Sequence, residues 1–192
     1  MKLHKIPASI TLAQGLLESG AGYSQLARKS NNHFGIKATS SWIENGGKYL
    51  VYTDDRPNEK FCQYANVGDS YEHHSQFLKR NGRYAGLFQL SPDDYKGWTN
   101  GLQDAGYASS KQYAATLQNI IEKNGLQKYD QMVMQEMKAL GKSFGTADNP
   151  CQATSDDVSV QDTEEKKYSF PLKREEFMLV TSPFGTRKDP LD

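Results

Sequence analysis

The sequence predicts an α+β fold that is mainly helical and carries one small β-hairpin lobe. Apolar residues recur at helical spacing in several segments of the chain, a pattern typical of amphipathic helices that share a core. One pair of segments is instead rich in the aromatic and β-branched residues that favour strands. Of the 192 residues, 36% are hydrophobic and 11% are aromatic, which is enough to fill a core without disulfide bonds.

The first helix is expected over residues 7–19. Proline is favoured in the first turn of a helix, and Gly20 is a typical residue beyond its end. One stripe of this helix is apolar, formed by Ile10, Leu12, Ala13, Leu16 and Leu17. Glu18 stands at the C-terminal end, where the helix dipole disfavours a negative charge, so the position suits a carboxyl group that keeps its proton. Residues 30–37 follow as a loop, because paired asparagines and a glycine favour turns.

A β-hairpin is expected over residues 49–64. Residues 49–53 and 61–64 are rich in Tyr, Val, Phe and Leu, which is the composition of strands. Residues 54–59 between them read DDRPNE and are turn formers. The hairpin therefore has an acidic tip.

Further helical segments are expected after the hairpin, over residues 70–80, 91–102, 110–124 and 127–140. Asp69 or Ser70 would cap the first of them, because short polar side chains accept hydrogen bonds from the free amides at a helix start. Gly125 separates the last two. These segments make the body of the protein mainly helical.

Charge and composition divide the chain into three parts. Residues 1–140 carry 16 basic and 13 acidic side chains and form the expected folded domain. Residues 141–168 carry three lysines and six acidic residues, the composition of a flexible linker. Residues 169–192 are too few for a core of their own. The whole chain has 23 basic and 23 acidic residues, so no net field favours nucleic acid, and no apolar run has the length of a membrane span.

Residues 9–37 read SITLAQGLLESGAGYSQLARKSNNHFGIK and resemble the opening of a bacterial glucosaminidase family that includes flagellar-rod muramidases and autolysins. The resemblance continues through residues 52–55, 71–77, 83–84, 113–117, 125–126 and 129–130. It implies a lysozyme-like fold and hydrolysis of β-1,4 bonds in the glycan of peptidoglycan. It also implies that Glu18 is the general acid of an endo-β-N-acetylglucosaminidase.

Glycoside hydrolysis usually needs a second group that activates water or stabilises the oxocarbenium-like state. The family hairpin commonly carries Thr-x-Glu, and Thr53, Asp54 and Asp55 stand at those positions. Asp55 thus takes the glutamate position with a side chain one methylene shorter, and Asp54 is its rival. Alternatively, the acetamide of the substrate attacks. Tyr113, at the position of an active-site tyrosine in similar enzymes, would then bond to the acetamide or to the attacking water.

The resemblance also suggests residues that bind the sugar. Asn32, Phe34 and Gly35 would shape the wall of the groove. Tyr84, Trp98 and Trp42 are aromatic side chains that would stack on sugar faces. The histidines lack the spacing of metal ligands, so neither a metal nor a cofactor is expected.

Residues 180–190 read VTSPFGTRKDP and are similar to the segment that opens lysostaphin-type zinc metallopeptidase domains. In such domains the zinc-binding His and Asp follow shortly afterwards, and here the sequence reaches residue 192 without them. The resemblance implies that residues 169–192 are the truncated start of such a domain, without zinc ligands.

Two other functions fit the same residues. A muramidase or lytic transglycosylase would use the same fold, and one acid suffices for the transglycosylase. A non-catalytic wall-binding module would keep the groove without turnover, a reading motivated by the short side chain of Asp55. In each case the expected partner is a peptidoglycan glycan strand. We expect a monomer, in the periplasm or cell envelope or secreted, beside a secretion, flagellar or DNA-transfer machine that passes the wall.

Overall fold

The computed structural model of the protein describes residues 1–53 and 57–144. Its elements in chain order are α1 (Ala8–Glu18), α2 (Gln25–Ser30), α3 (Ser40–Glu44), β1 (Tyr49–Tyr52), β2 (Glu59–Cys62), α4 (Val67–Arg80), the 3-10 helix η1 (Gly82–Gln89), α5 (Tyr95–Asp104), α6 (Tyr113–Lys123) and α7 (Gln127–Ala139). Helices dominate and the two strands form one small antiparallel sheet, which confirms the predicted fold class.

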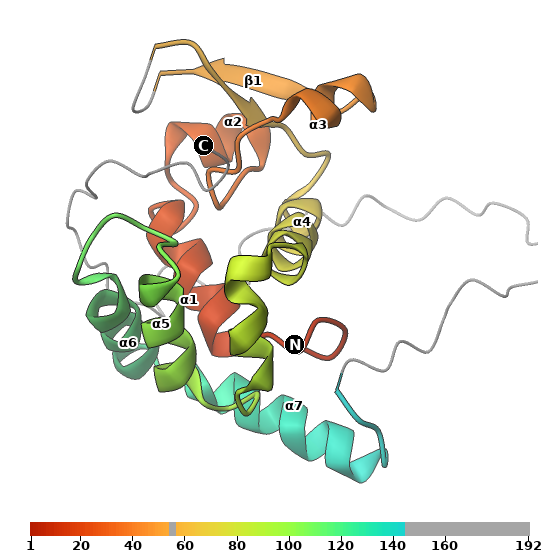
Figure 1. Ribbon diagram of the computed structural model, residues 1–192, viewed down its shortest axis with the longest axis vertical. Coiled ribbons are helices and arrows are strands. Elements are labelled where there is room, and N and C mark those ends of the chain that lie inside the picture. The colour runs from red at the N-terminus through yellow and green to blue at the C-terminus, as the bar shows by residue number, and fades with distance from the viewer. Residues whose placement is uncertain (54–56, 145–192) are drawn as a thin grey trace, which may run out of the picture.

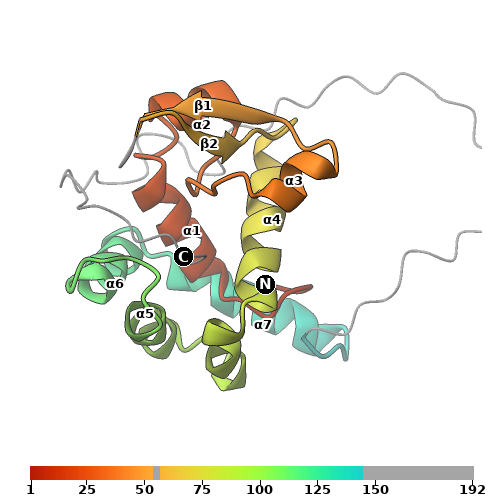
Figure 2. The same ribbon diagram turned by 45° about the horizontal axis from the view of Figure 1, so that its top comes forward.

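Helix α1 lies in the middle of the helical lobe (Figure 1). It packs against α4, α5, α6 and α7, and the hairpin with α2 and α3 forms a separate lobe over one end of α1 and α4 (Figure 2). Because neighbours surround it, α1 buries all of its apolar stripe except the partly buried Leu12, and it also buries Ser9, Gln14 and Gly15. Glu18 is the last residue of α1. It therefore lies at the end of the helix that the hairpin lobe covers, where the two lobes meet (Figure 2).

The hairpin is present, but its second strand begins earlier than predicted. Tyr52 pairs with Glu59 and Tyr49 pairs with Cys62, so β2 is Glu59–Cys62 rather than residues 61–64. Asn58 takes a left-handed conformation with φ of 60°, which closes the turn and lets the next residue join the ladder. Residues 54–56 lie outside the described residues, and they include the predicted site residues Asp54 and Asp55.

Several helix boundaries also differ from the prediction. Helix α4 begins at Val67, because the side chain of Asn66 accepts a hydrogen bond from the amide of Asp69 at 3.0 Å and caps the helix in place of Asp69 or Ser70. The segment expected over residues 91–102 is α5, capped by Asp94. The short helices α2, α3 and η1 were not predicted. Helices α6 and α7 lie within the ranges expected for them.

The start of α1 is capped from a distant part of the chain. Pro7 at its N-cap gives no side-chain hydrogen bond, and Oδ1 of Asp130 in α7 accepts one from the amide of Ser9 at 2.9 Å. Asp130 is 1% exposed, and burial raises the pKa of its carboxyl group above the model-compound value of 3.8 despite these hydrogen bonds. The cap joins the last helix of the domain to the first.

We expect Asp130→Asn to change how stability depends on pH. The folded state holds the proton of Asp130 more tightly than the unfolded chain, so this group stabilises the fold at low pH and loses that contribution as pH rises above 3.8. The wild type should therefore lose stability relative to Asp130→Asn as the pH rises from 3.5 to 7. Chemical denaturation measures this as a falling difference between the free energy of unfolding of the wild type and that of the variant. A constant or rising difference would contradict the assignment.

Candidate active site

Glu18 is half-buried at the last position of α1, and an unusual turn directs the chain away directly after it. Gly20, Ala21 and Gly22 all have positive φ, of 55°, 57° and 82°. Ser19 stabilises this turn, since its hydroxyl donates to the carbonyl oxygen of Gly15 at 2.5 Å and accepts from the amide of Gly22 at 2.7 Å. The left-handed conformation of Ala21 costs energy, because its Cβ atom crowds the backbone. This residue follows the predicted acid Glu18 by three positions.

Tyr113 contacts Glu18 directly. The tyrosine begins α6 and is 0% exposed, and its O–H group donates to Oε1 of Glu18 at 3.0 Å. The ring of Tyr107 stacks on that of Tyr113, with 5.5 Å between centroids and 19° between planes. Two predicted site residues 95 positions apart in sequence are thus brought together.

Sequence reasoning missed a third member of this group, Gln14. Its Nε2 donates to the phenol oxygen of Tyr113 at 2.9 Å, and the side chain is 0% exposed. The signal was available, because Gln14 precedes Glu18 by four residues and such pairs share one face of a helix. The three side chains form a continuous hydrogen-bonded chain from Gln14 through Tyr113 to Glu18.

Asn32 and Phe34 hold the loop together rather than facing a groove. The Nδ2 group of Asn32 donates to the carbonyl oxygens of Ile36 and Cys62, both at 2.9 Å, and its Oδ1 accepts from the amide of Ile36 at 3.1 Å. The ring of Phe34 is fully buried and stacks on His74, with 3.9 Å between centroids. Asn32 bonds only to the backbone of this chain in these contacts, and the ring of Phe34 is covered by its neighbours. Neither side chain is therefore placed to contact a sugar, which corrects their predicted role.

Tyr84 and Trp98 lie in the core. Both are 0% exposed, and Trp98 packs edge-on against Phe88 while Tyr84 packs against Phe77 and Tyr107. Their rings are therefore covered on the faces that a sugar would need, which corrects their predicted stacking role. A single aromatic residue in a helical pattern gives no sign of whether it faces a core or a groove.

Gly35 lines a hollow of about 710 Å³ between α3, β2 and α4. Neither Glu18 nor Tyr113 lines this hollow. Within it, Trp42 stacks on His73 with 5.1 Å between centroids, and Tyr64 is 2.8 Å from Nδ1 of His73. Burial, followed by the charge of Arg80, lowers the pKa of His73. The hollow is separate from the carboxyl group that is predicted to do the chemistry.

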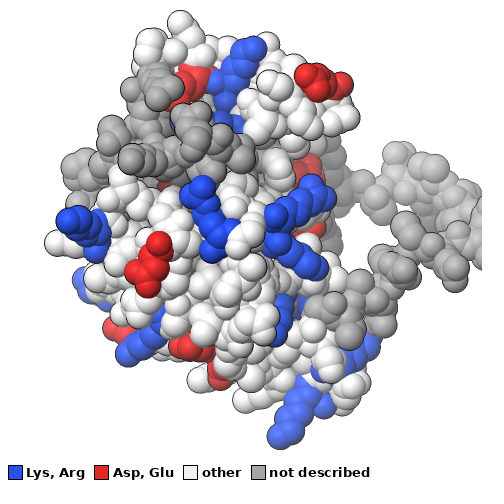
Figure 3. Space-filling view, viewed as in Figure 1, with Lys and Arg blue, Asp and Glu red and all other residues white. Residues whose placement is uncertain are grey.

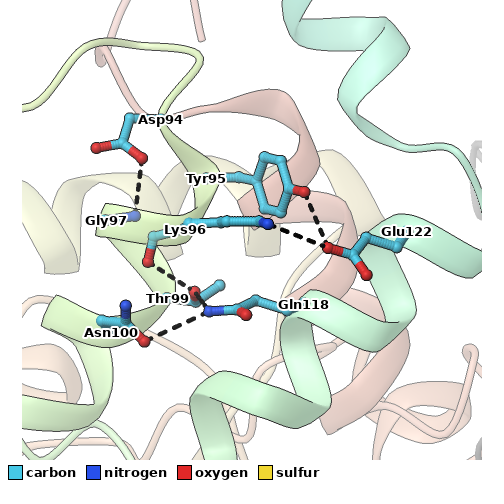
Figure 4. Close-up of polar contacts among 8 residues, drawn as sticks. All are labelled: Asp94, Tyr95, Lys96, Gly97, Thr99, Asn100, Gln118 and Glu122. Atoms are coloured by element: carbon cyan, nitrogen blue, oxygen red, sulfur yellow. Dashed lines mark hydrogen bonds and ion pairs between the residues drawn. The ribbon is translucent and has the colours of Figure 1, made fainter.

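Polar contacts join α5 to α6, the helix that begins with Tyr113 (Figure 4). The hydroxyl of Tyr95 donates to Glu122 at 3.0 Å, and Nε2 of Gln118 donates to Oγ1 of Thr99 at 2.8 Å. At the start of α6, the amide of Ala114 donates to Oε1 of Gln103 at 3.0 Å. The bond of Ala114 adjoins Tyr113, whereas Gln118 and Glu122 lie more than one turn further along α6.

Charged side chains of both signs share the face of the molecule seen in Figure 3. Lys and Arg side chains are spread over the viewed face, and Asp and Glu side chains lie among them (Figure 3). No group of three or more His, Cys, Asp or Glu residues is placed to hold a metal ion within residues 1–53 and 57–144. Among the same residues, no helix has the length and apolar character to cross a membrane.

Comparison with known proteins matches the sequence to a glycosidase family. The profile of the glucosaminidase family, described as mannosyl-glycoprotein endo-beta-N-acetylglucosaminidase, matches residues 1–126. Exo-glucosaminidase LytG of Bacillus subtilis is 30% identical over 87% of this chain and 62% of its own length. Peptidoglycan hydrolase FlgJ of Escherichia coli K12 is 33% identical over 61% of this chain and 40% of its own. The alignments thus span less than two thirds of either relative.

Solved structures give the same result. The catalytic domain of the autolysin Auto from Listeria monocytogenes superposes with a TM-score of 0.55 and 28% identity, covering 66% of this chain and 76% of that domain. The glycoside hydrolase domain of FlgJ from Salmonella typhimurium superposes with a TM-score of 0.51 and 30% identity, covering 71% of this chain and 82% of that domain.

Proposed function

The chain belongs to the glucosaminidase family, and we propose that this glycoside hydrolase cleaves β-1,4 bonds of peptidoglycan after N-acetylglucosamine, with Glu18 as general acid. The observation that supports the proposal most is the hydrogen bond of 3.0 Å from Tyr113 to Glu18. It fixes one oxygen of a half-buried carboxyl group at the junction of the two lobes. The names of LytG and FlgJ support the choice of polymer.

In the proposed acid step, Glu18 transfers its proton to the glycosidic oxygen as the bond from that oxygen to the anomeric carbon breaks. The leaving sugar departs as an alcohol, and positive charge develops on the anomeric carbon and ring oxygen. Glu18 becomes a carboxylate, and the O–H group of Tyr113 already donates to its Oε1. A donor aimed at charge that develops in the reaction lowers the barrier. Because Tyr113 is fully buried, we assign it this role in place of a contact with the substrate.

The second half of the reaction requires a nucleophile at the anomeric carbon. We propose that Asp55 at the hairpin tip deprotonates the attacking water, with Asp54 as its rival and the acetamide oxygen of the substrate as the alternative nucleophile. Both aspartates lie outside the described residues. The support for this assignment is the sequence, in which Asp55 takes the glutamate position of the Thr-x-Glu that the family hairpin commonly carries.

We expect Asp55→Asn to lower kcat on purified peptidoglycan by about 10²-fold, since an amide cannot accept the proton of the water. Asp54→Asn is the matched control and should leave kcat within threefold of the wild type, a margin of less than about 1 kcal/mol. The measurement is the initial rate of release of reducing ends. Equal and small effects of both substitutions would instead favour attack by the acetamide.

The products of digestion test the proposed function. The 192-residue chain and Glu18→Gln are incubated with purified peptidoglycan, and the released fragments are reduced with borohydride and analysed by mass spectrometry. Reducible N-acetylglucosamine ends, absent with the variant, support the proposal. Reducible N-acetylmuramic acid ends would indicate a muramidase, and anhydro ends a lytic transglycosylase. Wall binding without release would leave the binding-module function.

We further propose endo action, in line with the description of the family that matches residues 1–126. LytG is named an exo-glucosaminidase, so the two modes must be separated by experiment. With soluble glycan strands, an endo enzyme shortens the mean chain length early and releases fragments of several disaccharides. Release of single small products from the start, with the remaining strands still long, would overturn the endo assignment.

We propose that residues 1–140 form the catalytic domain, that residues 141–168 are an acidic tether, and that residues 169–192 begin a metallopeptidase-like segment. Residues 145–192 lie outside the described residues. Because peptidoglycan lies outside the cytoplasmic membrane, we propose that the protein acts in the periplasm, in the cell envelope or as a secreted protein. We also propose that the protein acts as a monomer, beside a secretion, flagellar or DNA-transfer machine that passes the wall.

A further inference from the structure

We propose that Gln14 is a positioning residue for the acid step, because its amide directs the phenol proton of Tyr113 toward Glu18. The inference rests on the proposed function of Glu18. Gln14 lies inside α1 and is 0% exposed. Its Nε2 is 2.9 Å from the phenol oxygen of Tyr113, and that oxygen is 3.0 Å from Oε1 of Glu18.

The donor and acceptor inventory sets the direction of this chain. A phenol has one proton to donate and can also accept, whereas an amide nitrogen of glutamine can only donate. With Nε2 facing it, the oxygen of Tyr113 accepts from Gln14, so its own proton points to Glu18. If the amide were reversed, Oε1 of Gln14 and Oε1 of Glu18 would compete for one phenol proton.

The cost of burying Gln14 supports a role beyond packing. Among the described residues, Oε1 of Gln14 is a buried acceptor without a hydrogen-bond partner, and such groups destabilise a fold. The neighbouring α1 positions Ala13 and Leu17 are buried and apolar. An apolar side chain would fill the same place without that cost, and it would leave the phenol of Tyr113 free to turn its proton elsewhere.

The proposed effect falls on the transition state more than on the bound ground state. Negative charge develops on Glu18 as its proton leaves, and the hydrogen bond from Tyr113 becomes charge-assisted and stronger at that moment. Donation from Gln14 polarises the phenol and strengthens the same bond. The proton of Tyr113 stays on its oxygen throughout. An interaction that strengthens only in the transition state changes kcat and not KM.

The test is a double-substitution cycle in the 192-residue chain. Gln14→Met removes the amide at similar length and should lower kcat on soluble glycan strands about tenfold, the effect of one hydrogen bond, with KM within twofold of the wild type. Tyr113→Phe should lower kcat by about 10²-fold, as for loss of a donor to a developing charge. In the Tyr113→Phe background, Gln14→Met should have less than a twofold further effect.

Gln118→Met is the matched control. Gln118 also donates through Nε2 between two helices, to Thr99 at 2.8 Å (Figure 4), but it does not touch Glu18 or Tyr113. Its substitution should lower the melting temperature and leave kcat unchanged. If Gln14→Met fails to fold, Gln14→Leu takes its place, because leucine is apolar like the neighbouring Ala13 and Leu17. It also donates nothing to the phenol of Tyr113, so kcat should fall while KM holds.

Three results would overturn the proposal: an unchanged kcat in Gln14→Met, an effect on KM alone, or an equal fold-loss in the wild-type and Tyr113→Phe backgrounds. The proposed function fails differently. If the wild type releases nothing from peptidoglycan, or if Glu18→Gln retains activity, the acid assignment is wrong. An active wild type, an inactive Glu18→Gln and an unaffected Gln14→Met would reject the role of Gln14 alone.

Discussion

Glu18→Gln should lower kcat on purified peptidoglycan by about 10²–10⁴-fold, the usual contribution of a general acid. The amide has no proton that it can transfer to a glycosidic oxygen. Its carbonyl oxygen can still accept the hydrogen bond that Tyr113 donates to Oε1 at 3.0 Å in the wild type. The variant should therefore fold and bind the wall as the wild type does. The measurement is the initial rate of reducing-end release, beside a thermal melt and a wall-sedimentation assay.

Glu18→Asp is an informative companion to this variant. It retains a transferable proton but withdraws it by one methylene, which changes its distance from both Tyr113 and the glycosidic oxygen. Since catalysis depends steeply on placement, its rate should lie between those of the wild type and Glu18→Gln. A Glu18→Gln enzyme that keeps more than a tenth of the wild-type rate would exclude Glu18 as the acid.

Gly15→Ala should destabilise the domain by about 1–3 kcal/mol, the usual cost of forcing extra volume into a packed core. In the middle of a helix the same substitution ordinarily stabilises by about 0.5–1 kcal/mol, so even the sign is diagnostic. A Cβ atom at Gly15 would lie 2.3 Å from the phenol oxygen of Tyr71 and 3.0 Å from its Cζ. Either the ring of Tyr71 would have to move within its packed surroundings or helices α1 and α4 would have to separate. The free energy of unfolding measured by chemical denaturation reports the change.

Tyr71→Phe provides the partner variant for this test. It removes the atom in closest conflict and leaves a contact of 3.0 Å to the ring, so Gly15→Ala should cost less in the Tyr71→Phe background. Gly86→Ala is the matched control, because nothing lies within 4 Å of the Cβ position there. A Gly15→Ala variant as stable as the wild type would mean that α1 and α4 can shift without loss.

The features that sequence predicted are those that depend on local pattern. The apolar stripe of α1 and the glycine after it placed Glu18 at a helix end, and the strand composition placed the hairpin. The second strand was misplaced by two residues because the left-handed conformation of Asn58 shortens the turn, and residue type alone does not determine that conformation.

The features that sequence missed depend on contacts between distant segments. Nothing in the helical pattern around Tyr113 distinguishes a ring that lies over Glu18 from one that lies in the core, and the same ambiguity put Tyr84 and Trp98 in a groove. Gln14 and Tyr113 are 99 residues apart, and their hydrogen bond exists only because α1 and α6 pack together. Tertiary packing decides such cases, because propensity and periodicity describe single elements.

The bond between Asp130 and the first turn of α1 affects where this domain can be cut. The family profile covers residues 1–126, yet the carboxylate that accepts from the amide of Ser9 comes from α7, beyond that limit. A fragment ending at residue 126 would retain Glu18, Tyr113 and Gln14 but would leave free amides at the start of the helix that carries the acid. The smallest unit that preserves the observed contacts therefore includes α7, and the end of the family profile is not the end of the folded body.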